Sequence, residues 1–399
     1  MLMRARHVAI AFLILLALEG LVRAAASAAL FREEMIKYRF DYFLCWSSVQ
    51  ALNRGMPDIY GGEKAQFDHA LSGGKWSFPD NHPPPYYLLF LPQSAFSFEA
   101  GFWVHNTLTT LLYFCGLWML GRLLLGSDAR WAVPLLVLGT LLAGIGMDNL
   151  FYGQVDFAAF FLLSCVLIAA LRGHEFAAGA CLGVAILMKG FPWYLLVYFA
   201  LERRWRVFIG VAAAAAVFTL AALTLWGLPN FHAYLQHSKG ASYYVLLLNQ
   251  SLMGWFVMHI HGALTLAQVK IVHAALTAGL LGFLAVLHAR VPARDPQEVT
   301  LEFACFVLAA MLGAAFSWGH HKVMMLFLVI PALSRALGDR MCPGAALVIF
   351  GIFLVHWSLE GEAAAEASRL GLWYYRAYGP LLMLAANFAI AVGLRVRRA

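Results

Sequence analysis

The sequence predicts an all-α polytopic membrane protein, and three observations indicate that class. Hydrophobic residues make up 62% of the 399 residues, charged residues only 12%, and the mean hydropathy is +0.74. A soluble domain carries about 25% charged residues, so this chain could not cover a water-facing surface. Apolar runs of roughly 15–25 residues recur along the chain, which is the length of a membrane-spanning helix.

The positive net charge does not by itself indicate a nucleic-acid-binding protein. It is +7, from 28 basic and 21 acidic residues. The basic residues stand in short clusters between the apolar runs, as the positive-inside rule expects of cytoplasmic loops, so we expect no nucleic-acid partner. The six cysteines show no CxxC or Cys/His spacing, and we expect neither a disulfide framework nor a metal site.

The first apolar run, about residues 7–30, follows Arg4 and Arg6. Its small-residue end resembles a secretory signal, but the run is long enough to cross a bilayer. We interpret it as an uncleaved first helix. The two arginines place its start in the cytoplasm and the segment after it outside.

Further candidate spans follow, and with the first helix they make about twelve. They lie near 83–98, 101–121, 131–147, 155–171, 178–201, 206–227, 264–289, 300–316, 322–336, 343–358 and 372–394. Both termini are then cytoplasmic. The basic clusters at Arg203-Arg204, at Arg335 and at the C-terminus agree with that orientation.

The topology of the middle of the chain stays open. With about twelve spans, Arg122, Arg130 and Arg172 would face outward, against the positive-inside rule. A re-entrant segment at 83–98 and a break within 178–201 would reverse those loops.

We expect one integral membrane domain over residues 1–399, with two substantial outer loops at 31–82 and 228–263. The first loop is longer than a connector needs. Its residues 41–53 carry aromatic and aliphatic side chains at helical spacing, which predicts a short interfacial helix.

Asp41 opens this helical segment, just beyond the first span. A carboxylate beside the bilayer, on an aromatic-rich segment, is where a membrane enzyme would place a general base. Asp58 lies in the same loop and is the competing candidate for that role.

Lys189 lies near the middle of the apolar run 178–201. An intramembrane cation costs roughly 2.5–3.5 kcal/mol on insertion scales, so a lysine there needs a reason. Gly190 and Pro192 follow it and break the helix, which frees backbone carbonyls. Lys189 either satisfies those carbonyls or meets an anionic ligand in a cavity.

The adjacent residues His320 and His321, followed by Lys322, stand at the predicted outer end of a helix, after Trp318. Neighbouring side chains on a helix point about 100° apart, so the two histidines would not readily chelate one metal ion. They are suited to donating hydrogen bonds to phosphate oxygens. The alternative is that they only mark the membrane boundary.

Two further groups have both functional and ordinary interpretations. Asn249 and Gln250 precede Trp255 in the second outer loop, and amides beside aromatic rings suit sugar hydroxyls, although the same residues also form plain turns. Arg376 stands among aromatic residues near the last span, where it is either a boundary residue reaching for the interface or a phosphate ligand.

Several common catalytic motifs are missing from the sequence. It contains no GxxxxGK[ST] and no convincing GxGxxG, so a nucleotide-sugar donor is not expected. It also lacks an HExxH zinc motif and a GxSxG nucleophile elbow.

Five short blocks, in order, cover residues from about 38 to 380. They are Asp41 through Gly55 to Tyr60, His82-Pro83-Pro84-Pro85, Gly153-Gln154-Val155-Asp156 through Lys189-Gly190-Phe191-Pro192 to Arg203-Arg204-Trp205, Asn249-Gln250-Ser251-Leu252, and Ser317-Trp318-Gly319-His320-His321. In this order the chain resembles glycosyltransferase family 87, the polyprenol-phosphate-mannose-dependent mannosyltransferases of the GT-C superfamily. Gly319, Met56 and Ile59 depart from the family pattern, which bears on substrate identity more than on fold.

The resemblance implies a GT-C-like fold and an inverting transfer of a sugar, usually mannose, from polyprenyl phosphate to a lipid or glycan acceptor. Asp41 would deprotonate the acceptor hydroxyl. The donor phosphate would be bound by Lys189, His320, His321 and Arg376. The implied sugar or acceptor contacts are Asp58, Tyr60, His82, Gln154, Asn249, Gln250, Trp255 and Trp318.

If the resemblance holds, we expect no cofactor and no metal, because fixed cations can stabilise the leaving phosphate. The site would lie on the extracytoplasmic side of a bacterial-type cytoplasmic membrane. Three alternatives remain. A related ligase or polymerase would use a pyrophosphate-linked donor, a transporter would show inverted repeats and paired broken helices, and a degenerate family member would lack activity.

Overall fold

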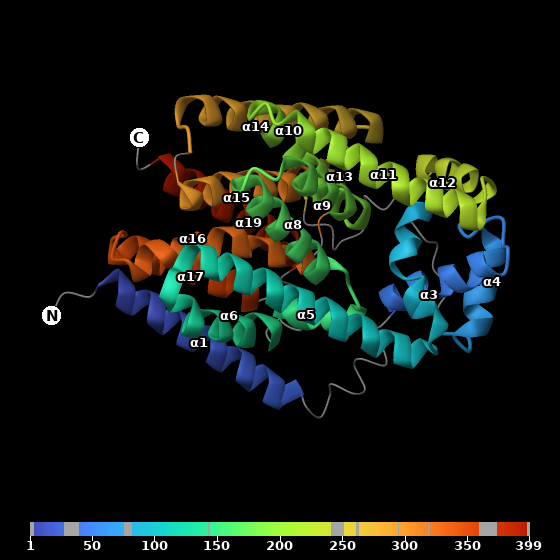
Figure 1. The fold of residues 1–399 in the computed structure, drawn as a ribbon, viewed down its shortest axis with the longest axis horizontal. Helices are drawn as coiled ribbons and strands as arrows, with labels where there is room; N and C mark the ends of the chain where they lie inside the picture. Colours follow the sequence, from blue (N-terminus) through green and yellow to red (C-terminus); the bar gives the residue numbers. More distant parts are fainter. Residues whose placement is uncertain are drawn as a thin grey trace.

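The computed structural model describes residues 4–27, 40–75, 82–142, 144–240, 251–260, 263–293, 295–315, 317, 319–358 and 373–396. Every regular element within these segments is an α-helix or a 3-10 helix. Most of the long helices run along the long axis of the molecule (Figure 1). The all-helical class expected from composition is confirmed.

The elements of the first half of the chain are α1 (Ala5–Ser27), α3 (Phe40–Asn53), α4 (Gly62–Leu71), η1 (Pro84–Leu89), η2 (Pro92–Ala95), α5 (Phe98–Leu125), η3 (Gly126–Asp128), α6 (Ala129–Leu142), α7 (Gly144–Tyr152), α8 (Asp156–Leu171), α9 (Glu175–Met188), η4 (Phe191–Tyr194) and α10 (Leu195–Leu201). Those of the second half are α11 (Trp205–Trp226), α12 (Pro229–Gly240), α13 (Leu252–Ile260), α14 (Leu266–Arg290), α15 (Pro296–Gly313), η6 (Gly319–Met325), α16 (Leu326–Leu337), α17 (Pro343–Ser358) and α19 (Trp373–Val396).

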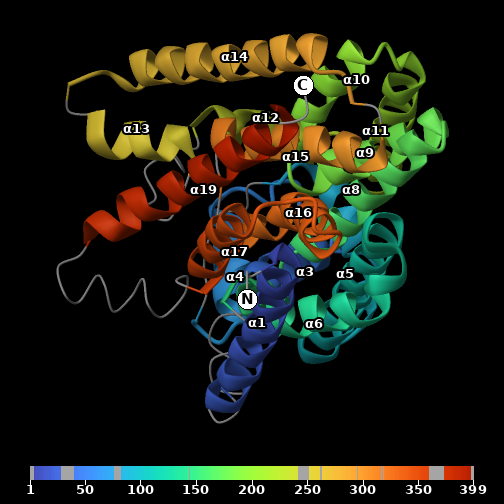
Figure 2. The ribbon, with the colours of Figure 1, turned by 90° about the vertical axis from the view of Figure 1, so that its left-hand side faces the viewer.

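Helices α15 and α16 form the centre of the bundle, and nearly all of their side chains are buried. The helices α10, α14 and α19 pack against α15, while α1, α5 and α17 pack against α16. The two views in Figures 1 and 2 agree in placing α15 and α16 between these neighbours. An apolar centre wrapped by apolar helices is the arrangement expected of a chain this poor in charge.

Helices α9 and α11 pack closely against each other, and glycines allow it. A Cβ added at Gly179 would collide with the backbone carbonyl of Val207, and one at Gly210 would collide with the carbonyl of Phe176. Small residues let two membrane helices approach until their backbones touch.

Within the described part of the chain, five helical segments are long and apolar enough to cross a membrane, by length and composition alone. They cover Ala5–Ala25, Phe98–Leu142, Trp205–Trp226, Leu266–Arg290 and Pro296–Gly313. Shorter apolar helices accompany them, including α8 and α9. The chain is therefore a multi-pass membrane protein, while the expected count of about twelve spans is not confirmed.

The candidate span over 83–98 was wrong as a continuous helix. Its residues form two short 3-10 helices, η1 and η2, each beginning at a proline. Proline has no backbone N–H, and Pro84, Pro85 and Pro92 together prevent an α-helical hydrogen-bond ladder from forming here. The segment packs against α3, α5 and α11.

The candidate span over 178–201 also does not run straight through. Helix α9 ends at Met188, and Gly190 and Pro192 turn the chain into η4 and α10. Lys189 is thus the residue at a turn between two helices, and not the middle of one helix.

The segment 178–201 folds back on itself, because its first and last residues both lie at the same end of the bundle. Helix α8 runs from Asp156, which contacts Lys189, to Leu171. Arg204, just after α10, donates from Nη1 to the carbonyl oxygen of Ala170 at 2.6 Å. The chain therefore leaves that end along α9 and returns to it along α10.

The loops that carry Arg122, Arg130 and Arg172 do not face away from the N-terminus, as a straight twelve-span topology would require. Asp128 in η3 lies 4.0 Å from Arg6. The end of α8, beside Arg172, contacts Arg204 through the hydrogen bond to Ala170 described above. The structure therefore follows the alternative topology, in which 83–98 does not cross and 178–201 is broken.

Helices α3, α4 and α12 gather at the opposite end of the bundle from the two chain ends (Figure 1). The helix expected over 41–53 is present as α3, and its Tyr42, Val49 and Leu52 are buried in an apolar cluster with η1. Asn230 joins α12 to the loop after α3, because it accepts from the Ile59 amide at 3.2 Å and donates to the Met56 carbonyl at 2.9 Å.

Candidate active site

Four elements from distant parts of the sequence meet at this end of the bundle. Asp41 stands in the first turn of α3, and Gln154 in the turn between α7 and α8. Lys189 ends α9, and His321 lies in η6. Helix ends and turns hold all four residues, where side chains can converge without crossing a helix.

A chain of polar contacts joins these residues. Gln154 donates from Nε2 to Oδ2 of Asp41, and Lys189 donates from Nζ to Oε1 of Gln154 at 2.7 Å. Lys189 Nζ also lies 3.0 Å from Oδ2 of Asp156, whose Oδ1 is 3.9 Å from Nε2 of His321. The structure thus brings together Asp41, Lys189 and His321, which the sequence placed far apart.

Asp156 is the member of this group that was not among the expected site residues. Its side chain is fully buried, and it begins α8, where a carboxylate is favoured by the helix dipole. A buried carboxylate needs a cation or several hydrogen-bond donors, and Lys189 supplies the cation. The signal in the sequence was its place two residues after Gln154 in the Gly-Gln-Val-Asp block.

His105 supports the turn that contains Gln154. Its Nδ1 lies 3.2 Å from Oε1 of Gln93, and its Nε2 lies 3.3 Å from the backbone oxygen of Gln154. The ring also packs against Tyr42 and Phe90, with centroids 5.1 and 5.4 Å away. His105 sits inside an apolar run of α5, and nothing in its sequence surroundings distinguished it as part of the site.

Tyr42 supports the site through packing. Its ring is buried next to Phe98 and Phe102, directly after Asp41. Burial, and to a smaller extent Cys45, raises the pKa of the Tyr42 hydroxyl above its usual range. Tyr42 therefore stays a neutral phenol.

Gly153 allows the Gln154 turn to approach α3. Its φ is +65°, a conformation that favours glycine. A Cβ there would stand 2.6 Å from Cβ of Tyr42 and 3.1 Å from the ring of Phe102. Any side chain at this position would push Gln154 away from Asp41.

The crowding predicts that Gly153→Ala is more damaging than Gly173→Ala. Gly173 also has a positive φ, +75°, but an added Cβ would meet nothing within 4 Å. Both variants bear the left-handed penalty of about 1–2 kcal/mol, and only Gly153→Ala adds the collision with Tyr42. Thermal unfolding of the purified proteins should show the larger decrease for Gly153→Ala. Equal decreases would contradict this account of the turn.

The first-loop residues expected to contact substrate form a structured group of their own. Asp58 accepts from the Tyr60 amide at 2.8 Å, in a turn within its own loop. The Tyr60 hydroxyl donates to the His82 carbonyl at 2.7 Å, and the His82 ring stacks on Tyr86 at 3.9 Å. These contacts give Asp58 a local structural role, whereas Asp41 is joined to Lys189 through one glutamine.

Several expected residues cannot be placed in the site. Asn249, Gln250 and Trp318 lie outside the described residues. His320 belongs to η6 and Arg376 to α19, but their side chains also lie outside the described part. Trp255 is half-buried in α13 and packs into a separate apolar cluster with the start of α14.

Lys322 follows the histidine pair but faces another partner. Its side chain is buried, and Asp148 of α7 is the carboxylate that interacts with its ammonium group. Helix α7 packs against η6 at this point. Lys322 therefore interacts electrostatically with α7, against which η6 packs.

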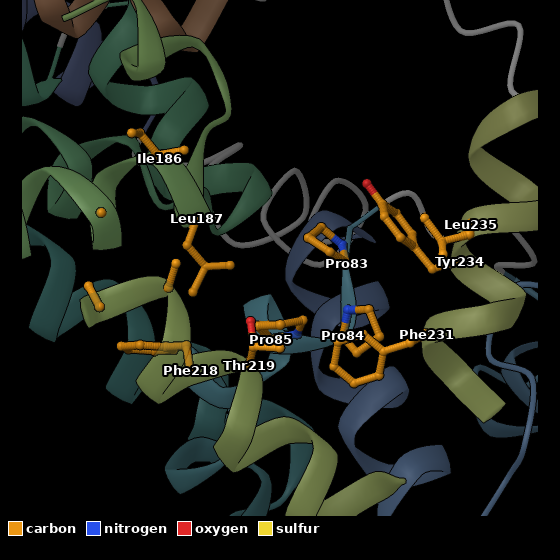
Figure 3. A pocket seen from close by; sticks show the side chains of 13 residues that line it. Pro83, Pro84, Pro85, Ile186, Leu187, Phe218, Thr219, Phe231, Tyr234 and Leu235 are labelled. Carbon is orange, nitrogen blue, oxygen red and sulfur yellow. The ribbon is translucent and has the colours of Figure 1, made fainter. Parts of the chain in front are cut away.

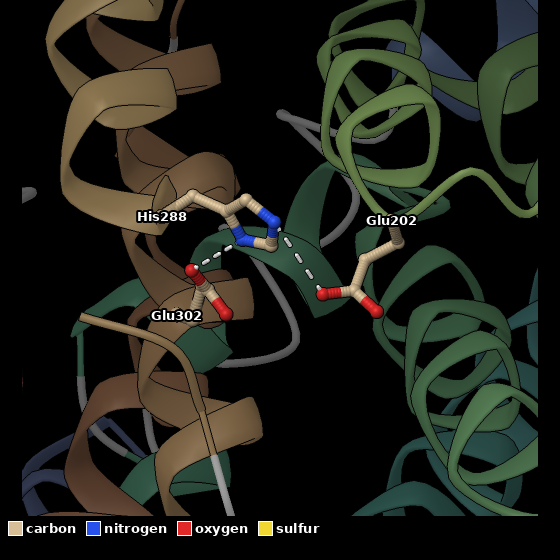
Figure 4. A group of neighbouring side chains, drawn as sticks. All are labelled: Glu202, His288 and Glu302. Carbon is tan, nitrogen blue, oxygen red and sulfur yellow. Dashed lines mark hydrogen bonds and ion pairs between the residues drawn. The ribbon is translucent and has the colours of Figure 1, made fainter. Parts of the chain in front are cut away.

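Among the described residues, one group of side chains could ligate a metal ion. Its members lie away from Asp41 and Lys189, at the end of the bundle that holds the chain termini. They are Glu202, His288 and Glu302, with His288 Nδ1 3.0 Å from Glu302 and Nε2 3.7 Å from Glu202 (Figure 4). Arg204 lies 3.4 Å from Glu202, and Arg395 lies 3.7 Å from Glu302. Because each carboxylate already faces an arginine, the group is balanced as an ion-pair network that ties α10, α14, α15 and α19 together.

Two comparisons with known proteins bear on this geometry. The profile of glycosyltransferase family 87 matches residues 81–317, more than half of the chain, and it includes Gln154, Asp156 and Lys189. A polyprenol-phosphate-mannose-dependent alpha-(1-2)-phosphatidylinositol mannoside mannosyltransferase from Mycobacterium tuberculosis is 25% identical over 359 residues. That alignment covers 86% of this chain and 81% of the relative.

Proposed function

Because this chain belongs to glycosyltransferase family 87, we propose that it transfers mannose from polyprenyl phosphate to a hydroxyl group of a lipid or glycan acceptor. The donor class follows from the name of the Mycobacterium tuberculosis relative, which depends on polyprenol-phosphate mannose. The relative's acceptor is a phosphatidylinositol mannoside by its name, and we extend to this chain only the chemical class, a lipid-linked or glycan hydroxyl.

One observation carries the proposal: a single glutamine amide joins a carboxylate to an ammonium group. Gln154 donates to Asp41 with its nitrogen and accepts from Lys189 with its oxygen. A base and a phosphate-binding cation held this close can act on the two sides of one anomeric carbon. Fixing such groups before substrate binds is a main source of catalytic rate enhancement.

In the proposed reaction, the acceptor oxygen attacks the anomeric carbon as Asp41 removes the proton from that oxygen. The bond from this carbon to the phosphate oxygen breaks, and polyprenyl phosphate leaves with the bonding electrons. Attack opposite to the leaving group inverts the configuration of the sugar. The proton remains on Asp41 until solvent removes it.

Lys189 meets the charge that develops on the leaving phosphate. An ammonium group has three N–H donors, and Gln154 and Asp156 take two of them within the described part of the chain. The third donor is then available to a phosphate oxygen. His321, held near Asp156 on the other side of the same carboxylate, adds a second hydrogen-bond donor to that oxygen.

We place this site at the outer face of a bacterial-type cytoplasmic membrane. Arg204, Arg335 and Arg395 lie at the end of the bundle that holds both termini, and Asp41 lies at the other end. Basic residues concentrate on the cytoplasmic side of membrane proteins. The carboxylate then faces outward, where a lipid-linked donor replaces nucleotide sugars.

The purified protein should transfer labelled mannose from synthetic polyprenyl-phosphate mannose to a membrane lipid extract, and GDP-mannose should give no product. EDTA should leave the rate unchanged, because Lys189 supplies the positive charge that a metal would otherwise provide.

A second donor, polyprenyl-phosphate glucose, separates the donor class from the sugar. Transfer of glucose in preference to mannose would correct the sugar and keep the reaction class. No transfer from any polyprenyl-phosphate sugar, with acceptors from several extracts, would contradict the proposed function.

A further inference from the structure

A cavity of about 420 Å³ opens between η1, α9, α11 and α12. The three residues Pro83, Pro84 and Pro85 form one wall, and Figure 3 shows them, with Phe231 and Tyr234, facing Leu187 and Phe218. Its volume is within the range of small-molecule sites, about 300–1,000 Å³.

The walls of this cavity suit a hydrocarbon. Among the described residues that line it, the polar side chains are those of Thr219 and Tyr234, and none is charged. A sugar or a phosphate placed there would lose its hydrogen bonds to water and gain almost none. Rings of proline, phenylalanine and tyrosine offer many dispersion contacts to a hydrocarbon chain.

The cavity begins next to the candidate active site. Leu187 lines it and stands two residues before Lys189, the residue that caps the C-terminal end of α9. Its far wall contacts the first loop, since Tyr234 packs on Tyr60 with ring centroids 5.6 Å apart. A ligand whose anionic end contacts Lys189 can therefore extend its apolar end into the cavity.

The other side of the cavity reaches the apolar outer surface of the bundle. Ala215 and Leu235 line it and are exposed, with 57% of the Leu235 side chain accessible. Leu220 of α11 and Leu228, just before α12, are also exposed. An apolar surface of this kind on a membrane protein faces lipid, so a long chain can continue from the cavity into the bilayer.

We propose that this cavity binds the isoprene units next to the phosphate of the polyprenyl-phosphate donor. The inference rests on the proposed function for the identity of the donor, and it adds the place where the lipid is recognised. In a bilayer the chain gains little from leaving water, so the selectivity comes from the fit of methyl branches against the ring-lined walls. The cavity then positions the phosphate at Lys189 before the sugar reacts.

The direct test uses polyprenyl phosphate without a sugar, carrying a diazirine on an isoprene unit near the phosphate. After irradiation of the protein in nanodiscs, we expect labelled peptides from 214–219 of α11 and 231–235 of α12. Unlabelled polyprenyl phosphate should compete. A phosphatidylglycerol with a diazirine in its acyl chain is the parallel probe, and it should label the cavity weakly and resist that competition.

Wall variants make the test specific. Ala215→Trp should decrease labelling and raise KM for the long-chain donor about tenfold, with little change in kcat, because the indole occupies the cavity. Thr219→Trp, one turn along the same face of α11, should act alike. Ala216→Trp adds the same bulk to the neighbouring exposed position, which does not line the cavity, and should change neither quantity.

The outcomes separate this inference from the proposed function. Labelling of the cavity without sugar transfer would retain the lipid site and reject the mannosyltransferase. Three results would overturn the lipid site: transfer with labelling only outside these segments, equal losses in Ala215→Trp and Ala216→Trp, or a phosphatidylglycerol label that polyprenyl phosphate does not reduce.

Discussion

Replacing Asp41 with asparagine should lower the rate of mannose transfer by about 10²–10⁴-fold, the usual contribution of a general base. Asparagine has the same shape and keeps an oxygen that can accept from Gln154, so the hydrogen bond and the fold of α3 survive. What is lost is the negative charge that accepts the acceptor's proton. The measurement is kcat with saturating polyprenyl-phosphate mannose, together with the thermal midpoint of the purified variant.

Asp58→Asn is the matched control in the same loop. Its Oδ1 accepts from the Tyr60 amide, and asparagine retains this acceptor. The variant should therefore keep far more of the transfer rate than Asp41→Asn. If Asp58→Asn removes transfer and Asp41→Asn does not, the two carboxylates have been assigned the wrong way round.

The helical membrane class was predictable because it depends on composition, which every part of the chain shares. The individual spans were harder to predict, because hydropathy does not register hydrogen bonding. The run 83–98 is apolar enough for a span, yet its prolines prevent a helix. The run 178–201 is long enough for a span, yet Gly190 and Pro192 fold it back on itself.

The site residues that could be predicted from the sequence are those whose charge has an energetic cost in an apolar environment. Lys189 and Asp41 were recognised because a charge beside or within an apolar run needs an explanation. The structure places them on the same glutamine, and the separation of 148 residues between them conveyed none of that geometry. Gln154 was expected to contact substrate, and its observed position between the two charges adds a positioning role.

Asp156 and His105 were missed for a physical reason. Each one is a buried polar side chain whose partner comes from another helix, Lys189 for Asp156 and Gln93 and Gln154 for His105. Sequence periodicity reports which face of a helix is apolar, and it does not report which polar groups pair across helices. Asn249, Gln250 and Trp318 lie outside the described residues and remain predictions from the sequence.

Lys189→Met should both remove transfer and destabilise the protein. The loss of a cation that meets developing charge costs about 10²–10³-fold in rate. The same change leaves the fully buried Asp156 without its ammonium partner, and breaking a buried ion pair costs about 3–5 kcal/mol. An inactive Lys189→Met protein would therefore not distinguish a catalytic lysine from a structural one.

The double variant Lys189→Met/Asp156→Asn makes that distinction. With both charges removed, no buried ion is left unpaired, so the thermal midpoint should recover most of what Lys189→Met loses. Transfer should stay as low as in Lys189→Met, because the phosphate still lacks its cation. Recovery of both stability and transfer would show that Lys189 only balances Asp156. Recovery of stability alone would leave the ammonium group with a task in the reaction itself.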